Sequence, residues 1–353
     1  MSASSLDTLF AASIMICLVL SSMIGVFTVI QPLLDAPSSD WKRTDLRLAE
    51  YLLSDEGSPS DWGEEINKTL IKFGLARRDA QRPYVLSIDK VTRLNAANRD
   101  HIDPLEAFEA LNIADKPFQI VIRPLFNVTV NDVSITEGES EVTYRFKIST
   151  TRFNLPVAAQ IKCYAIIGDQ IVECSSSTSE SGVGEIELSL TKSLSGTALL
   201  VIFAKVEPNV LSYTVYPFIH NSEGSPNEAG SYASLSPLNY TLRAYLKDPS
   251  NRILYAKVLT YNYQFNLTMI ENASSTQTFL VPRILDKSVM ILVGTGLDAD
   301  SSEYFAEWVS YPQVPLRFGL NFTGKHHLTN AYSSRFLVTI NSATYECEVI
   351  FGG

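Results

Sequence analysis

Charged side chains are absent from a long apolar stretch near the start of the chain, between Thr8 and Leu34. At about 1.5 Å per residue, a helix from Leu9 to Ile30 would be roughly 33 Å long, enough to cross a hydrocarbon core of about 30 Å. The pattern predicts a transmembrane anchor at residues 1–35, with the lipid bilayer as its partner. The alternative is a cleaved secretory signal, which needs a basic leader and a small-residue exit, and this stretch has neither.

A small α+β region is predicted for residues 36–124. Residues 40–53 have the spacing of an amphipathic helix. A second helix is expected to begin at Asp103 as N-cap, with Pro104 at its first position, and to end near Asn112. Alternation of side chains over Phe118–Ile122 then predicts a strand.

Beyond residue 124 the pattern becomes that of β-strands, so the predicted fold class is mainly β. Residues 142–149 and 185–190 alternate between apolar and polar, and residues 198–204 are continuously apolar, as in a central strand. The spacing of about seven strands is similar to that of Ig-like modules, which implies an Ig-like β-sandwich at residues 125–220.

A polar linker rich in Gly, Pro, Ser and Asn follows at residues 221–230. The remainder, residues 231–353, is predicted to form a second β-sandwich. The alternative is one large β unit that shares strands across the linker. The strands expected in this remainder are 240–246, 254–263, 278–281, 289–293, 305–310, 316–322, 336–340 and 345–351.

Two of the four cysteines lie on either side of a hairpin signal at residues 168–169. Counting outward from this turn places Cys163 directly opposite Cys174, at the Cα separation of about 5.5 Å that a disulfide needs. We predict that bridge; the alternative is two reduced, half-buried thiols. Cys17 is expected to pack within the apolar stretch, and Cys347 to lie unpaired on a strand.

Acceptor motifs for N-linked glycans occur more often than expected by chance. A chain so rich in Ser and Thr would contain about three at random. The motifs lie at Asn67, Asn127, Asn239, Asn266, Asn272 and Asn321. They predict surface glycosylation.

The two kinds of evidence on orientation disagree. Lys42, Arg43 and Arg47 follow the apolar stretch, and the positive-inside rule would place that side in the cytoplasm. A persistent disulfide and used glycosylation motifs both require the opposite side. We give them more weight and predict a single-pass protein of the cell membrane with its C-terminal region extracellular.

The bulk composition excludes some classes. Of the 353 residues, 46% are hydrophobic and 19% charged, as in a folded protein rather than a disordered one. The net charge of −10, without a basic stripe, argues against nucleic acid as a partner. No catalytic residue, cofactor or metal site is predicted, because none of the four histidines has metal-ligand spacing.

Three motifs invite a chemical interpretation that the residues do not favour. Residues 294–296, Gly-Thr-Gly, lack the third glycine and the helix of a nucleotide loop, so a turn is predicted. Residues 298–303 resemble a calcium loop without its glycine and are expected to form a solvated acidic hairpin tip. Tyr261, Tyr263 and Phe265 alternate; a sandwich core is predicted, with an exposed aromatic strip as the alternative.

A series of short motifs in the first third of the chain is similar to archaeal pilin-like (type IV pilin and pseudopilin-related) membrane-anchored surface proteins. The motifs, in order, are Tyr51–Ser54, Gly57–Gly63, Phe73–Ala76, Tyr84–Leu86 with Asp89–Leu94, and the helix and strand predicted at 103–122. The resemblance implies an exported head region held by an N-terminal helix, able to assemble through it. Residues 4–8 lack the basic residue and glycine at which the prepilin peptidase cuts in that family.

Together these features predict a non-catalytic extracytoplasmic surface protein for adhesion, envelope scaffolding or pilus-like assembly. Other surface or pilin-like proteins and glycans are the expected partners. One alternative is a membrane-anchored extracytoplasmic hydrolase acting on envelope polymers. Another is a minor subunit of a pilus or secretion apparatus.

Overall fold

The computed structural model describes residues 13–23, 43–113, 116–283, 288–322 and 331–352. The chain divides into two compact units, Met1–Glu50 and Tyr51–Gly353. Helices cover residues 13–23 and 43–54. In the described ranges, no helix has both the length and the apolar character that crossing a membrane requires. The predicted anchor, residues 1–35, is described only at 13–23, and its other residues lie outside the described ranges.

Two short helices of the larger unit lie between its first two strands, β1 (Val85–Leu86) and β2 (Phe118–Pro124). α3 (Pro104–Leu111) has Asp103 as N-cap, whose side chain accepts a hydrogen bond from the Leu105 amide, and ends at Asn112 in the left-handed region. This confirms the predicted helix. α2 (Ile88–Thr92) was not predicted, because five fully buried residues carry no amphipathic pattern.

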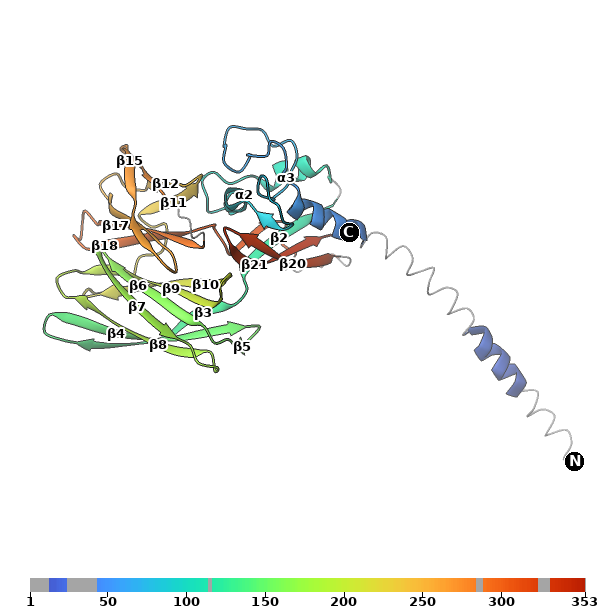
Figure 1. The fold of residues 1–353 in the computed structure, drawn as a ribbon, viewed down its shortest axis with the longest axis horizontal. Helices are drawn as coiled ribbons and strands as arrows, with labels where there is room; N and C mark the ends of the chain where they lie inside the picture. The colour runs from blue at the N-terminus through green and yellow to red at the C-terminus, as the bar shows by residue number, and fades with distance from the viewer. Residues whose placement is uncertain (1–12, 24–42, 114–115, 284–287, 323–330, 353) are drawn as a thin grey trace, which may run out of the picture. The chain divides into compact units, whose positions relative to one another are not determined.

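The larger unit is mainly β, and its strands form four sheets (Figure 1). A five-stranded sheet brings together strands from far apart in the sequence. Its members, in spatial order, are β1 (Val85–Leu86), β20 (Tyr332–Ile340), β21 (Ala343–Phe351), β2 (Phe118–Pro124) and β19 (Leu316–Gly319). The rings of Phe73, Phe118 and Phe318 pack together against it, with centroids 6.1 to 6.3 Å apart.

Two sheets pack face to face over residues 127–220. One contains β3 (Asn127–Glu137), β4 (Glu141–Arg152), β5 (Leu155–Pro156) and β8 (Val183–Thr191). The other contains β6 (Gln160–Ile167), β7 (Gln170–Ser177), β9 (Gly196–Glu207) and β10 (Val210–His220). Alternate residues of β4 and β8 meet those of β6 and β9 in one core that includes Phe146, Leu188 and Leu200. The alternating residues of β4 and β8 and the continuously apolar run of β9 thus form strands, as predicted from the sequence.

The β6–β7 hairpin has the predicted register. Gly168 takes a φ of +54° in its turn, and Ala165 lies opposite Val172. Cys163 lies opposite Cys174, and the two form a disulfide with a Cα separation of 5.1 Å.

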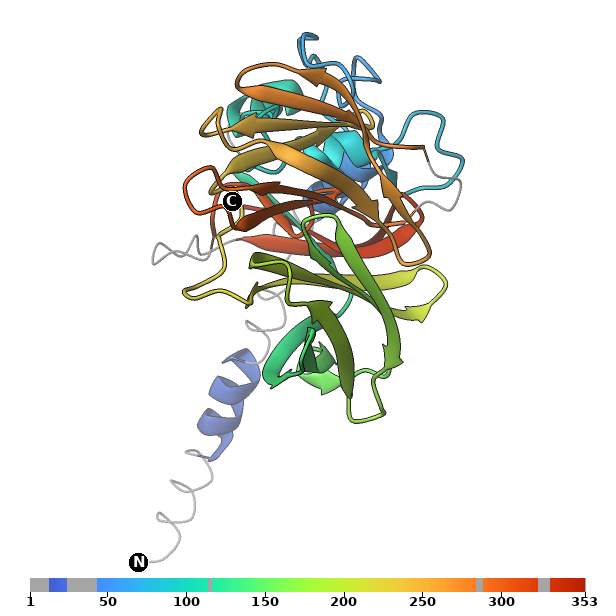
Figure 2. The same ribbon diagram turned by 90° about the vertical axis from the view of Figure 1, so that its left-hand side faces the viewer.

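The second of these sheets continues into strands from the C-terminal half. Tyr304 pairs in parallel with Gly196, so β18 (Tyr304–Tyr311) lies beside β9. Beyond β18 come β17 (Met290–Leu297), β13 (Ile253–Leu259) and β14 (Gln264–Asn266), which give eight strands in all. A four-stranded sheet is formed by β11 (Ala233–Leu238), β12 (Thr241–Leu246), β16 (Thr276–Leu280) and β15 (Thr268–Asn272), and its strand β11 contacts β18. Figure 2 shows the same strands turned by 90°.

Strand pairing crosses the domain boundaries expected from the sequence. β19, β20 and β21 pair with β1 and β2 of the 36–124 region, and β18 pairs with β9 across residues 221–230. The linker itself is bonded to both strands. The Asn227 side chain accepts from the Ala306 amide of β18 at 3.0 Å and donates to its carbonyl at 2.9 Å, and the Asn227 backbone amide donates to the Thr197 hydroxyl of β9 at 3.0 Å. This sharing of strands is the arrangement that the sequence left open as its alternative.

The turn predicted at residues 294–296 is wrong. Gly294 and Gly296 lie inside β17, paired with β13 and β18. Added Cβ atoms would overlap the Ile253 side chain at Gly294, and the Phe305 ring at Gly296. The glycines serve close packing between strands rather than a reversal of the chain.

Candidate functional site

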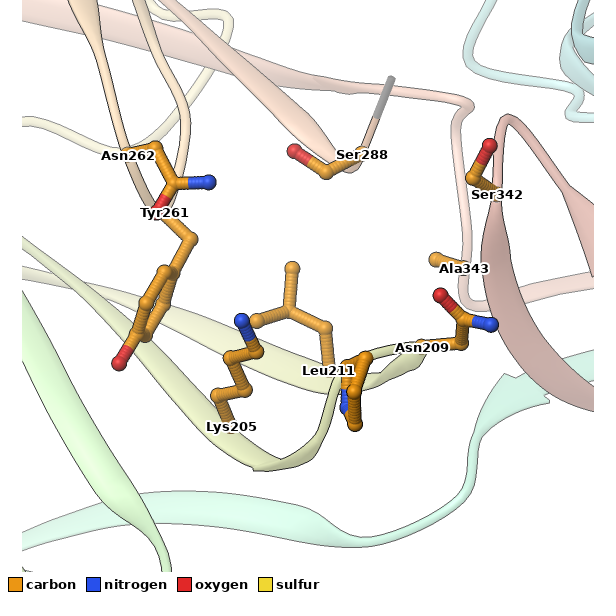
Figure 3. A pocket seen from close by; sticks show the side chains of 9 residues that line it. Lys205, Asn209, Leu211, Tyr261, Asn262, Ser288, Ser342 and Ala343 are labelled. Carbon is orange, nitrogen blue, oxygen red and sulfur yellow. The ribbon is translucent and has the colours of Figure 1, made fainter. Parts of the chain in front are cut away.

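A cavity of 220 Å³ opens where three turns of the larger unit meet (Figure 3). It is smaller than the roughly 300–1,000 Å³ typical of sites for drug-sized ligands, so it has room only for a small ligand or for one group of a larger ligand. Its lining residues are Lys205, Pro208, Asn209, Leu211, Tyr261, Asn262, Ser288, Ser342 and Ala343.

Hydrogen bonds to backbone carbonyls hold the turns together. In the β9–β10 turn, the Asn209 carbonyl accepts from the Thr344 backbone amide at 2.8 Å. In the β20–β21 turn, Asn341 and Ser342 have φ values of +50° and +69°, and the side-chain amide of Asn341 donates to the Ser288 carbonyl at 2.7 Å. The walls of the cavity are therefore fixed by contacts between elements that are remote in sequence.

The lining combines one charged group with neutral hydrogen-bonding groups. Lys205 supplies the only charge among the nine lining residues, and its ammonium lies 4.9 Å from the centre of the Tyr261 ring. The Tyr261 hydroxyl points away from the cavity and donates to Gln160 at 3.3 Å (Figure 3). Amide and hydroxyl groups complete the lining beside the apolar Leu211. Such a lining can accept an anionic or hydroxyl-rich group, and it contains no carboxylate, imidazole or thiol.

Two of the three aromatic residues predicted to form a core, Tyr263 and Phe265, are exposed, which corrects that prediction, while Tyr261 is half-buried in the turn between β13 and β14. Tyr263 and Phe265 are 46% and 43% exposed, and their rings stack at 6.0 Å. β13 ends at Leu259, and after a turn β14 pairs antiparallel with it as the last strand of the eight-stranded sheet. Alternation alone indicated a half-buried strand and did not distinguish a central strand from an edge strand.

A buried polar network joins α2 to the C-terminal strands. Asp89 is 3% exposed, and its carboxylate accepts from the Tyr311 hydroxyl at 2.6 Å and the Asn239 amide at 2.8 Å. Burial raises the pKa of Asp89 to about 6, against the lowering effect of these two hydrogen bonds. Next to it, burial lowers the pKa of Lys90 to about 8, although its ammonium donates to the Glu56 and Ala76 carbonyls.

The described histidines have structural partners. His220 is fully buried, with one ring nitrogen 2.8 Å from the Tyr144 hydroxyl and the other 2.8 Å from the Thr191 carbonyl. Nε2 must therefore donate to Thr191, and Nδ1 accepts from Tyr144. His101 contacts the Asn98 carbonyl. His326 and His327 lie outside the described residues.

The acidic residues 298–303 form the β17–β18 turn, as predicted. The Asp298 carboxylate accepts hydrogen bonds from the hydroxyls of Ser301, at 3.0 Å, and Tyr232, at 3.3 Å. Within the described ranges, no group of three or more His, Cys, Asp and Glu side chains is arranged to hold a metal ion.

The predicted glycosylation sites differ in their surroundings. Five acceptor side chains are exposed: Asn67, Asn127, Asn266, Asn272 and Asn321. Asn239 is half-buried, with a φ of +44°, and belongs to the Asp89 network. The motifs thus give the positions at which a glycan could be attached, and the structure shows that five of the six asparagines are accessible to solvent while Asn239 is less so.

The two cysteines outside the bridge also differ. Cys347 lies on β21, fully buried and unpaired, and burial raises the pKa of its thiol to about 12. It is a strand residue, as predicted. Cys17 is exposed on the helix of residues 13–23.

No family model matches the chain, and no curated protein matches it significantly. Among solved structures, red sea bream transglutaminase is 12% identical over 52% of this chain and 31% of its own, with a TM-score of 0.18. A chimeric titin Z1Z2 is 12% identical over 55% of this chain and 96% of its own (TM-score 0.16). Human GIVD cytosolic phospholipase A2 is 10% identical over 67% and 33% (TM-score 0.14). The chain thus matches about a third of the two enzymes' lengths, and these scores carry no argument about function.

Sequence reasoning missed the cavity and the Asp89 network. The cavity gathers turns at 208–209, 261–262 and 341–342, each of which reads alone as an ordinary polar turn. Asp89 had one local signal, a carboxylate close to the apolar residues Ile88 and Val91, but its partners lie 150 and 222 residues further along the chain.

Proposed function

We propose that the chain is an extracytoplasmic surface protein, held in the cell membrane by its N-terminal apolar segment, whose β-rich unit serves contact with other molecules rather than catalysis. In this proposal residues 127–220 act as an Ig-like module, and the C-terminal strands complete a second module together with the 36–124 region. Adhesion, envelope scaffolding and assembly with related chains are the uses that such a unit would have.

The observation that carries the proposal is the Cys163–Cys174 disulfide. Structural disulfides persist in oxidising compartments and are rare in reducing ones, so a bridge across the β6–β7 hairpin supports export of the β-rich unit. A protein exported in this way needs a means of staying at the cell surface, and the charge-free stretch from Thr8 to Leu34 supplies one.

The contact surfaces available support binding rather than chemistry. The cavity of Figure 3 presents one ammonium, amides and hydroxyls, and the strip at Tyr263 and Phe265 presents stacked rings to solvent. Aromatic faces and hydrogen-bonding side chains of this kind are suited to sugars and to protein surfaces. His220, whose two ring nitrogens are occupied by a tyrosine and a carbonyl, offers no support for the alternative of a hydrolase.

Membrane fractionation tests the tether. The full chain should sediment with membranes and resist extraction by alkaline carbonate. Leu18→Lys with Val19→Lys adds two charges to the apolar segment, at about 2.5–3.5 kcal/mol each near the centre of a membrane, and should release the protein. Ile71→Lys, at a position 73% exposed in the larger unit, is the matched control and should leave it in the membrane. Recovery of the unaltered protein in the soluble fraction would contradict the proposal.

A further inference from the structure

Two edge strands follow one another without a break at residues 264–272. β14 is the last strand of the eight-stranded sheet, and β15 is the last of the four-stranded sheet. Leu267 lies between them, buried, with its amide bonded to the Ala256 carbonyl at 2.8 Å. All eight other residues of this 264–272 edge are exposed. In the described part of the chain, no strand pairs with its outer side.

The 264–272 edge lacks most of the features by which proteins prevent edge strands from pairing. Its sequence contains no Pro, Gly, Lys or Arg, and Glu271 is its only charged residue. Phe265, Met269 and Ile270 are 43%, 39% and 57% exposed. One register shift, between Met269 and Glu271, interrupts the pairing of β15 with β16. An exposed apolar edge of this kind is a template for another strand unless something covers it.

Glycan acceptor motifs are concentrated on this edge. Its nine residues contain two of the six acceptor asparagines of a 353-residue chain, Asn266 and Asn272. Lys257 donates to Oδ1 of Asn266 at 2.9 Å, and Arg252 donates to Oδ1 of Asn272. In both cases the described hydrogen bonds use the oxygen, and the nitrogen that would carry a glycan takes part in none of them.

We propose that N-linked glycans on Asn266 and Asn272 cover the 264–272 edge and keep it from pairing with a second copy of the chain. This inference rests on the proposed extracytoplasmic location. In the reaction, Nδ2 bonds to C1 of a sugar from a lipid-linked, phosphate-activated oligosaccharide. The bond between sugar and phosphate breaks, the lipid phosphate leaves, and Nδ2 loses a proton. Hydrated glycan chains then exclude a partner strand from the apolar side chains.

Asn239 provides an internal contrast. Its backbone amide is bonded to the buried Asp89 carboxylate, its side-chain oxygen accepts from Arg283 at 3.3 Å, and its side chain is half-buried. A transferase reaches an asparagine in an exposed, extended segment more readily than one fixed by a buried network. Asn239 should therefore stay unmodified in the folded protein.

Glycopeptide mass spectrometry of the full-length protein, purified from membranes of a host with N-glycosylation, tests occupancy. Peptides containing Asn266 and Asn272 should carry glycan, and the peptide containing Asn239 should not. Bare Asn266 and Asn272 would overturn the inference. Protease treatment of the same intact cells reports location: an exported protein that is bare at both sites refutes this inference alone, whereas a protein that remains inside refutes the proposed function as well.

Variants that alter the motifs and leave both asparagines in place test the shielding role. Thr268→Ala with Ser274→Ala removes both acceptor motifs; Thr268→Ser with Ser274→Thr keeps them and is the matched control. Light scattering of the full chains in detergent should show self-association at least about tenfold tighter for the alanine pair. Adding Ile270→Lys should reverse this, because it places a charge on the edge.

Two results would overturn the shielding role. One is equal association of the alanine pair and its control. The other is increased association that Ile270→Lys does not reverse, which would indicate another surface. If the alanine pair does not fold, as judged by loss of the Cys163–Cys174 bridge, enzymatic removal of the glycans from the folded protein gives the same comparison.

Discussion

The Asp89 carboxylate offers the most quantitative prediction. It is buried, and its pKa is raised from 3.8 to about 6 mainly by loss of hydration. The folded and unfolded pKa values of Asp89 thus differ by about two units, and each unit corresponds to about 1.36 kcal/mol. Folding therefore favours the neutral acid over the carboxylate by about 3 kcal/mol. Because the folded pKa is the higher one, this stabilisation is fully present below pH 3.8 and is lost as the pH rises through about 6.

Asp89→Asn isolates this effect. The amide has the shape of the acid, keeps an oxygen for the Tyr311 hydroxyl and the Asn239 amide, and cannot ionise. Relative to the unaltered protein, the variant should gain about 3 kcal/mol of unfolding free energy between about pH 4 and pH 7.5. The unpaired N–H groups of the new amide cost about 1–3 kcal/mol, but they add a constant offset and leave the change with pH intact.

Guanidinium unfolding of the full chain in detergent, followed at several pH values, measures this difference. Asp248→Asn is the control: Asp248 is fully exposed, and its pKa is lowered by hydrogen bonds from Ser250, so the control difference should not rise with pH. A pH-independent difference for Asp89→Asn would refute the reasoning, because it would mean that the carboxylate keeps its hydration in the folded protein.

Three further predictions address other parts of the fold. Replacing Cys163 and Cys174 by Ser should lower the unfolding free energy by roughly 3 kcal/mol under non-reducing conditions, since the bridge closes a short loop; no change in midpoint would contradict this. Burial lowers the pKa of His220, so its NMR titration midpoint should fall below 6.5, and its contribution to stability, present above pH 6.5, should be lost as the pH falls below that value. Gly296→Ala should cost at least about 1–3 kcal/mol by calorimetry, because the methyl group meets the Arg252 backbone carbonyl and the Phe305 ring; an unchanged melting temperature would show that the strands can separate.

Local features of the fold could be predicted from the sequence. The cap at Asp103 fixes the start of α3, and a two-residue turn fixes which residues of the β6–β7 hairpin face each other. Both depend on residues within about a dozen positions, where backbone geometry leaves few choices. The alternating residues of β4 indicate a strand with one buried face, and the continuous apolar run of β9 indicates a strand buried on both faces, as the structure has them.

Strand pairing between distant segments could not be predicted in this way. β2 pairs with β21, whose residues lie more than 200 positions away, and apolar alternation does not specify the partner. The same limit explains the error at Tyr263 and Phe265: whether an alternating strand lies at an edge depends on which strands pair beside it. It also explains why the cavity of Figure 3, built from three separate turns, left no signal in the sequence.

The central claim is that the β-rich unit lies outside the membrane in an oxidising environment. Protease treatment of intact cells, followed by mass spectrometry without reduction, tests it most directly. Peptides from residues 127–353 should be released, and the peptide pair containing Cys163 and Cys174 should be recovered as a disulfide. Protection of these peptides until the cells are lysed, with both cysteines recovered as free thiols, would contradict it.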